Sequence, residues 1–202
     1  RAGYQVHQNM PDLEKSGGTF LGADFDGDGL LDCAMVVGSQ WYLWSSSAAY
    51  AASGPFDLGV AGDVPMAADF DGDGLADPAL AVGDALYVWL SRNNYQPLTP
   101  FNPGIPLLTP ACGDLDGDGL ADLASLVDGR WYVLFSSAGY QPTAPFDLHV
   151  PGFPLIADFD GDGKGDPAVR AVNGTWHIWL SGADYYHVAV PLPTEPLGLS
   201  LT

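Results

Sequence analysis

The chain has 202 residues, of which 47% are hydrophobic, and its formal net charge is -19. This composition suits a folded domain with a hydrophobic core rather than a disordered acidic tail. The negative charge excludes nucleic acid as a partner. The absence of a run of about eighteen apolar residues excludes a helical membrane span. The chain begins at Arg1 without a signal-like segment, as expected for a processed or excised fragment.

A ten-residue acidic phrase, ADFDGDGLLD at residues 23–32, is the first of four similar copies. It returns as ADFDGDGLAD at 68–77, GDLDGDGLAD at 113–122 and ADFDGDGKGD at 157–166. The copies contain 16 of the 25 acidic residues, so the negative charge is local. Two further series recur every 45 residues: Trp41, Leu86, Trp131 and Trp176, and Tyr50, Tyr95, Tyr140 and Tyr185. The chain is therefore built from four repeats.

Each repeat predicts four short strands in chain order. The segment that enters the acidic phrase, such as residues 63–70, predicts a first strand rich in small residues. The apolar run after the phrase, such as residues 33–37, predicts a second strand that ends in a two-residue turn. An aromatic segment such as residues 41–44 predicts a third strand covered on both faces. A polar segment with prolines, such as residues 95–101, predicts an outer edge strand.

This pattern indicates an all-β fold, a β-propeller with four blades of four antiparallel strands. We predict one propeller domain over residues 1–202, with repeats at approximately 20–64, 65–109, 110–153 and 154–202. Because Tyr4–Leu13 also aligns with the outer strands, residues 1–19 are predicted to close the ring by strand exchange beside Trp176–Leu180. The segment from Tyr186 onward would then be a spare tail. A ring of eight blades from two chains is the open alternative.

The acidic phrase has the pattern D-x-D-G-D-G-x-x-D, which places carboxylates at positions 1, 3, 5 and 9 of a tight loop. Ca²⁺ takes six to eight oxygen ligands, which alternate side chains of a curling loop can supply. We expect one Ca²⁺ per repeat, about four in all, with the backbone carbonyl of position 7 as a further ligand. The glycine at position 6, namely Gly29, Gly74, Gly119 or Gly163, permits the sharp turn. The predicted ligands are Asp24, Asp26, Asp28, Leu30 and Asp32; Asp69, Asp71, Asp73, Leu75 and Asp77; Asp114, Asp116, Asp118, Leu120 and Asp122; and Asp158, Asp160, Asp162, Lys164 and Asp166.

Two other interpretations of the phrase are weaker. An EF-hand needs a glutamate at position 12 and a helix on each side. Position 12 is instead Met35, Leu80, Ser125 or Val169, and the flanks predict strands. A solvated turn without a metal would leave four like charges repelling one another in each loop. The phrase contains no His or Cys, which argues against zinc or copper.

The repeat between Phe20 and Tyr185 resembles the FG-GAP and VCBS-type repeats of integrin α-subunit propellers and of many bacterial secreted proteins. In that family the loop D-x-D-G-D-G-x-x-D joins the first two strands of a blade. The resemblance implies calcium in the loops, a β-propeller fold and a role in adhesion, glycan binding or protein binding outside the cytosol. The present repeat is shorter than the integrin one, and its copies are fewer than is usual in the family.

We therefore expect an extracellular, calcium-binding module for adhesion or ligand binding, secreted or on the cell surface, whose ligand is a glycan or a protein. The alternative is a structural subunit whose terminal segments add strands to neighbouring molecules and build an oligomer or fibre. An enzyme is disfavoured, because no copy carries a specialised polar cluster. The histidines also lack a catalytic partner at a suitable spacing; they are His7, His149, His177 and His187. No catalytic residue is predicted, and the ligand-binding residues stay unknown.

The aromatic residues and the cysteines complete the predictions. The strict periodicity of the tryptophans favours a core role over sugar stacking; they are Trp41, Trp44, Trp89, Trp131, Trp176 and Trp179. The recurring tyrosines lie nearer a surface and suit a structural corner better than a ligand contact. Cys33 and Cys112 occupy non-equivalent positions, and a disulfide between them stays open.

Overall fold

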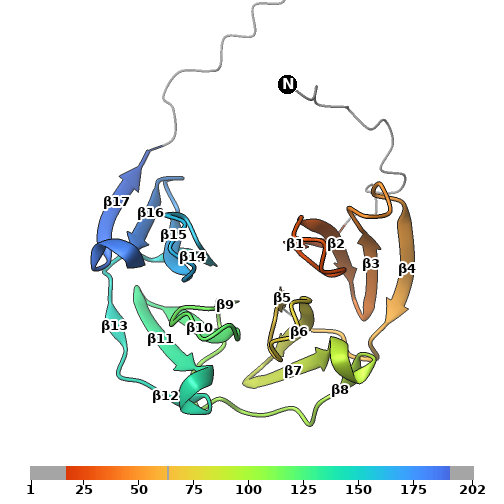
Figure 1. Ribbon diagram of the computed structural model, residues 1–202. Helices are drawn as coiled ribbons and strands as arrows, with labels where there is room; N and C mark the ends of the chain where they lie inside the picture. Colours follow the sequence, from red (N-terminus) through yellow and green to blue (C-terminus); the bar gives the residue numbers. More distant parts are fainter. Residues whose placement is uncertain (1–16, 63, 192–202) are drawn as a thin grey trace, which may run out of the picture. The chain divides into compact units, whose positions relative to one another are not determined.

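The computed structural model describes residues 17–62 and 64–191, which form four antiparallel β-sheets (Figure 1). The chain divides into two compact units, residues 1–100 and residues 101–202, with two sheets in each. Within the described ranges, the only helical segments are three single-turn 3₁₀ helices.

The first unit holds two sheets whose strands follow chain order. The first sheet contains β1 (Thr19–Ala23), β2 (Asp32–Val37), β3 (Gln40–Trp44) and β4 (Ala52–Asp57). The second contains β5 (Val64–Ala68), β6 (Asp77–Val82), β7 (Ala85–Leu90) and β8 (Gln96–Pro97), with the 3₁₀ helix η1 (Ser91–Asn93) between β7 and β8. The first strands of the two sheets, β1 and β5, lie side by side.

The second unit repeats this arrangement. Its first sheet contains β9 (Pro110–Gly113), β10 (Asp122–Val127), β11 (Arg130–Phe135), β12 (Gln141–Pro142) and β13 (Phe146–Asp147). Its second sheet contains β14 (Gly152–Ala157), β15 (Asp166–Ala171), β16 (Trp176–Leu180) and β17 (Tyr186–Val190). The 3₁₀ helices η2 (Ser136–Ala138) and η3 (Ser181–Ala183) follow the third strand of each sheet. The first strands, β9 and β14, again lie side by side.

The outer strands are short where prolines interrupt them. β8 pairs with β7 over only two residues, and β12 and β13 are two separate segments that both pair with β11. Pro142 and Pro145 flank the interruption in the third sheet. Proline has no backbone N–H to donate to a neighbouring strand, so it weakens pairing at these edges and makes them poor templates for aggregation.

The chain is thus an all-β protein of the β-propeller class, and the predicted four blades of antiparallel strands are confirmed. The first three predicted turns between second and third strands also lie as expected, at residues 38–39, 83–84 and 128–129. The fourth connection is longer, because β15 ends at Ala171 and β16 begins at Trp176. The single-domain assignment for residues 1–202 and its repeat boundaries stay predictions.

The assignment of the segment from Tyr186 to a spare tail was wrong. Residues Tyr186–Val190 form β17, which pairs with β16 through five residue pairs from Trp176↔Val190 to Leu180↔Tyr186. The fourth blade therefore obtains its outer strand from its own repeat. Strand exchange by residues 1–19 is not seen, since residues 1–16 lie outside the described part and Thr19 begins β1.

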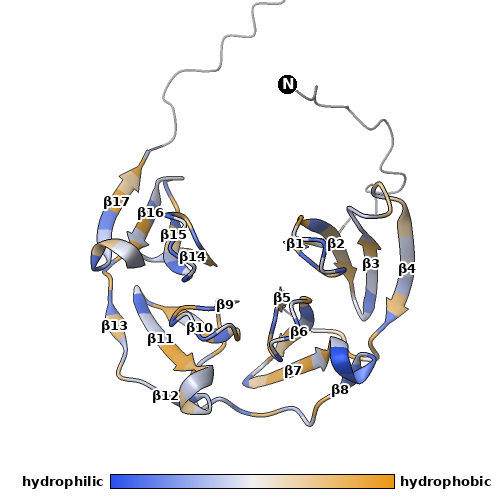
Figure 2. Ribbon diagram, in the orientation of Figure 1, coloured by the Kyte–Doolittle hydropathy of each residue, from blue (hydrophilic) through white to orange (hydrophobic). Residues whose placement is uncertain are grey.

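The core of each unit lies between its two sheets. In the first unit, Phe25 and Trp41 of one blade pack with Ala76 of the next. In the second unit, Leu115 and Trp131 pack with Ile156, Val169 and Trp179 in the same way. Figure 2 shows apolar residues along β7 and β11 and a strongly polar turn before β8.

The prediction that the tryptophans serve the core is confirmed for five of the six. Trp176 is the exception, because it is only partly buried. The buried tryptophans are Trp41, Trp44, Trp89, Trp131 and Trp179.

Neither cysteine takes part in a disulfide in the described structure.

The pH dependence of stability is expected to include a contribution from a histidine pair on the fourth blade. Nδ1 of His177 on β16 lies 2.9 Å from Nε2 of His187 on β17, and both rings stack near Trp179. Burial and the neighbouring His187 lower the pKa of His177 below its ordinary value of 6.5. The unfolded chain therefore binds this proton more readily, so stability falls as the pH drops below about 6.5.

Melting temperatures between pH 7.5 and pH 5.5 check this prediction in the wild-type protein and in His177→Gln. The variant should lose less stability on acidification than the wild type. Equal losses in the two proteins would contradict the assignment.

Candidate metal centre

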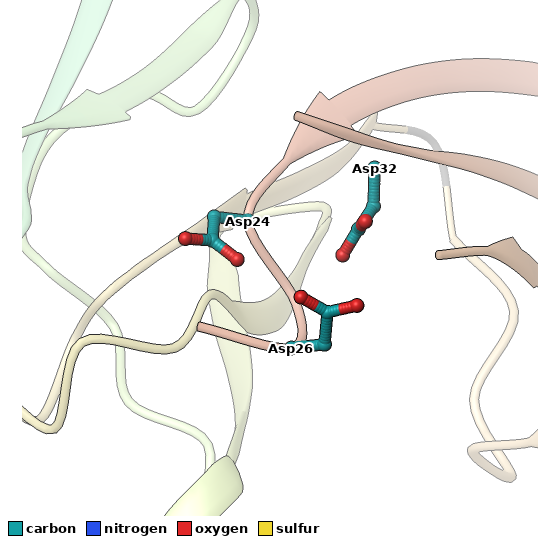
Figure 3. Close-up of side chains that lie close together, drawn as sticks. All are labelled: Asp24, Asp26 and Asp32. Carbon is teal, nitrogen blue, oxygen red and sulfur yellow. The ribbon is translucent and has the colours of Figure 1, made fainter. Parts of the chain in front are cut away.

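Each acidic phrase forms the loop between the first and second strands of a blade, and three carboxylates of each loop converge. In the loop between β1 and β2, one carboxylate oxygen from each of Asp24, Asp26 and Asp32 lies within 4.8 Å of the other two (Figure 3). Oxygens bound to one Ca²⁺ at 2.3–2.6 Å are at most about 5 Å apart, so this spacing fits a shared cation. The equivalent groups are Asp69, Asp71 and Asp77; Asp114, Asp116 and Asp122; and Asp158, Asp160 and Asp166.

The position 1 aspartate shapes the loop by accepting backbone hydrogen bonds. The N–H groups of Gly27 and Gly29 donate to Oδ1 and Oδ2 of Asp24 at 2.6 and 2.8 Å. Both glycines have positive φ, 80° and 81°, which other residues rarely adopt. The predicted role of the position 6 glycine is confirmed by this conformation, and the glycine at position 4 adds a second turn that the sequence analysis did not single out.

The position 9 aspartate is the buried anchor of the site. Asp122, at the start of β10, is fully buried. Its carboxylate accepts hydrogen bonds from the backbone N–H groups of Leu115 at 2.8 Å and Ser136 at 2.7 Å. Asp77 accepts the equivalent bonds from Phe70 and Ser91. These bonds fix one end of each loop to the turn after the third strand.

Burial raises the pKa of Asp77 and that of Asp122, although their backbone hydrogen bonds act in the opposite direction. A bound cation would offset this cost by favouring the charged carboxylate. The ligand set is also entirely oxygen, as calcium prefers. Both observations fit a hard divalent cation in these loops.

The position 5 aspartate does not belong to the converging groups. Oδ1 of Asp28 accepts the N–H of Leu30 at 2.8 Å, and Oδ2 accepts the hydroxyl of Ser46 at 2.6 Å. Its role as a ligand therefore stays a prediction, as does that of the position 7 carbonyl. The position 5 residues are Asp28, Asp73, Asp118 and Asp162, and the position 7 residues are Leu30, Leu75, Leu120 and Lys164.

A serine just after the third strand connects two positions of every loop, and the sequence analysis missed it. Ser46 donates its N–H to Asp32 at 2.6 Å and its hydroxyl to Asp28. A signal was present in the sequence, because these serines recur every 45 residues. The four are Ser46, Ser91, Ser136 and Ser181.

Replacing one of these serines is expected to cost a modest amount of stability. Ser136→Ala removes the hydroxyl bond to Asp118, which is 2.8 Å long and exposed, but keeps the N–H bond to Asp122. We expect a loss of about 1 kcal/mol in the free energy of unfolding, measured by urea denaturation with Ca²⁺ present. Ser53→Ala, which removes a bond to the carbonyl of Leu43 outside the loops, is the control. If the loss of stability in Ser136→Ala changes when Ca²⁺ is removed, and the loss in Ser53→Ala does not, the hydroxyl of Ser136 acts at the metal site.

All four recurring tyrosines have positive φ, and two of them, Tyr50 and Tyr140, form structural corners. The backbone of Tyr140 has positive φ, and its hydroxyl donates to the carbonyl of Ala121 at 2.8 Å. Tyr50 makes the same bond to Leu31 at 3.3 Å. In the first and third blades, these bonds tie the end of the acidic loop to the turn that carries the serine.

Two equivalent apolar clefts lie between consecutive blades, one in each unit. The cleft of the second unit has a volume of about 210 Å³ and is lined by Trp131, Phe146, Trp179 and Tyr185, among others. The cleft of the first unit has a volume of about 340 Å³ and is lined by the counterparts Trp41, Phe56 and Tyr95. The recurring tyrosines of the second and fourth blades, Tyr95 and Tyr185, border these clefts.

The fold and the loops define a class: a β-propeller whose blades each carry an acidic loop between their first two strands. The family model described as an FG-GAP-like repeat matches residues 24–80 and 69–125, which together span half of the chain. The chain belongs to the FG-GAP-like repeat family. No curated protein matches its sequence.

Several solved structures resemble the chain at low identity. Two are crystal structures of BBS1N in complex with ARL6DN. The structure soaked with mercury has 16% sequence identity and a TM-score of 0.48, and the match covers 88% of this chain. The structure soaked with lead has 14% sequence identity and a TM-score of 0.49, and the match covers 86% of this chain. The third is a Tc holotoxin pore of Photorhabdus luminescens, with 19% identity, a TM-score of 0.45 and coverage of 93% of this chain. The chain spans 54% and 68% of the two BBS1N chains and 10% of the toxin chain. In the described ranges, no helix is long and apolar enough to cross a membrane.

Proposed function

We propose that this chain is an extracellular β-propeller module that binds a protein or glycan ligand, with Ca²⁺ in a structural role and no catalytic activity. The observation that carries the calcium assignment is the convergence of three carboxylates in every blade, at a spacing that suits one cation. Each site fixes the start of a second strand to the turn after a third strand. Calcium at that point stabilises the blade and leaves the clefts between blades free for a ligand.

The two equivalent clefts are the proposed ligand sites. Their linings are apolar and aromatic, which suits the burial of an apolar group. A protein side chain fits such a lining better than a sugar does, because sugar hydroxyls lose hydrogen bonds with water and need polar partners in return. A protein ligand is therefore favoured within the proposal.

Binding of the calcium-loaded chain to panels of extracellular proteins and of glycans tests this function. Phe146 lines the cleft of the second unit and is 52% exposed, whereas Phe20 is 53% exposed and lines neither cleft. Phe146→Ser should lower the number of ligand molecules bound per chain, because only the cleft of the first unit stays intact, and Phe20→Ser should not, with both variants folded. Equal binding by the two variants, or no partner in either panel, would count against the clefts as ligand sites.

A structural subunit that self-associates is the second candidate. The fourth blade carries an exposed apolar groove formed by Leu155, Phe159, Trp176, Ile178 and Val190. Exposed apolar surface of this kind is typical of protein contacts. Light scattering across a range of concentrations tests this candidate: Phe159→Ser should reduce assembly, and a monomer at every concentration would refute it.

A further inference from the structure

The position 3 carboxylates have different partners in the four blades. In each blade the residue that follows the recurring serine reaches the position 3 aspartate. Two blades use a serine hydroxyl, one uses a glycine N–H and the second blade uses an arginine side chain. The pairs are Ser47 with Asp26, Arg92 with Asp71, Ser137 with Asp116, and Gly182 with Asp160.

The arginine pair is the only charged one of the four. Nε of Arg92 lies 2.9 Å from Oδ2 of Asp71. The side chain of Asp71 is 3% exposed, whereas that of Arg92 is 56% exposed. In the described part of the chain, no hydrogen-bond donor other than Arg92 reaches either carboxylate oxygen of Asp71. The guanidinium charge is therefore the group that offsets this buried carboxylate.

This charge competes with a metal ion. A hydroxyl or an N–H group is neutral and leaves the charge of the carboxylate available to a cation. Arg92 instead places a full positive charge 2.9 Å from an oxygen that a Ca²⁺ would bind at 2.3–2.6 Å. The ion must either tolerate the nearby charge or displace the arginine towards solvent, and both lower its affinity.

We infer that Arg92 makes the second loop, with Asp69, Asp71 and Asp77, the weakest of the four Ca²⁺ sites. The inference rests on the proposed binding of Ca²⁺ by the loops. The chain then binds three ions more tightly than the fourth. The second blade depends less on the metal, because Arg92, in the turn after β7, places a positive charge beside its acidic loop.

Calorimetric titration of the full chain with Ca²⁺ alone, supported by ion counting in native mass spectrometry, tests the inference. The wild type should show three tighter sites and one site weaker by about tenfold or more. Arg92→Ser places in the second blade the residue that the first and third blades use, and it should give four similar sites. The reciprocal change Ser47→Arg should weaken a second site.

Arg130→Ser is the matched control. Arg130 is 57% exposed, and its Nε lies 3.5 Å from Oδ2 of Asp147, outside the loops. This variant should keep the pattern of the wild type. Four equal sites in the wild type, or an unchanged pattern in Arg92→Ser, would overturn the inference and leave calcium binding intact. The absence of any bound Ca²⁺ would overturn both the inference and the proposed calcium role.

Discussion

Removing Ca²⁺ with EGTA is expected to lower the melting temperature of the chain by about 10 °C or more. At ten times its dissociation constant, each bound ion stabilises the folded state by about 1.4 kcal/mol, so three or four ions contribute roughly 4 to 6 kcal/mol. For a chain of this size each kcal/mol shifts the melting temperature by about 2–4 °C. The loss is comparable with the lower end of the total stability of a domain.

The physical reason lies in the apo loops. Without an ion, three carboxylates that each bring one oxygen within 4.8 Å of the others repel one another in every blade. The buried Asp77 and Asp122 then lack the charge that would offset their burial. The cost recurs in each blade, because the loop has the same construction in each.

Circular dichroism melts with Ca²⁺, with EGTA and with EGTA plus excess Ca²⁺ measure the effect. Full recovery in the third sample separates metal loss from irreversible damage. Mg²⁺ in place of Ca²⁺ should recover less stability, because it is smaller and demands a stricter geometry. A shift of only a degree or two on chelation would refute the stabilising role.

The blades and loops could be predicted from sequence because their signals are local and periodic. Alternating strands, turn residues and the acidic phrase lie within one repeat and return every 45 residues. Because the acidic phrase recurs in every repeat, it can be distinguished from an ordinary turn. The convergence of Asp24, Asp26 and Asp32 follows from the same local pattern.

The missed features depend on contacts made after folding. The burial of Asp32 and its bond to the N–H of Ser46 join residues fourteen positions apart, across a complete hairpin. The contact of Arg92 with Asp71, where two other blades use a serine hydroxyl, cannot be predicted from the sequence. It forms only when the turn after β7 folds over the acidic loop. The error over β17 arose because Tyr4–Leu13 and Tyr186–Val190 both match an edge strand, and pairing decides between them.

Asp122→Ala is expected to be among the most damaging single substitutions in the acidic loops. Asp122 is fully buried and accepts the N–H groups of Leu115 and Ser136. Alanine leaves the buried N–H of Leu115 and the partly buried N–H of Ser136 without an acceptor and removes one carboxylate of the converging group, at a cost of about 3–5 kcal/mol in the free energy of unfolding with Ca²⁺ present. Urea denaturation measures this loss.

The matched control is Asp118→Ala in the same loop. Asp118 lies outside the converging group and is exposed, and its side chain accepts from Leu120 and from the hydroxyl of Ser136. It should cost about 1–2 kcal/mol, since both partners can turn to water. With EGTA present, Asp122→Ala should still be the worse variant, because the N–H groups of Leu115 and Ser136 lose their acceptor whether or not an ion is bound. Equal losses for the two variants would show that position 9 is an ordinary ligand and not the anchor that joins loop, strand and turn.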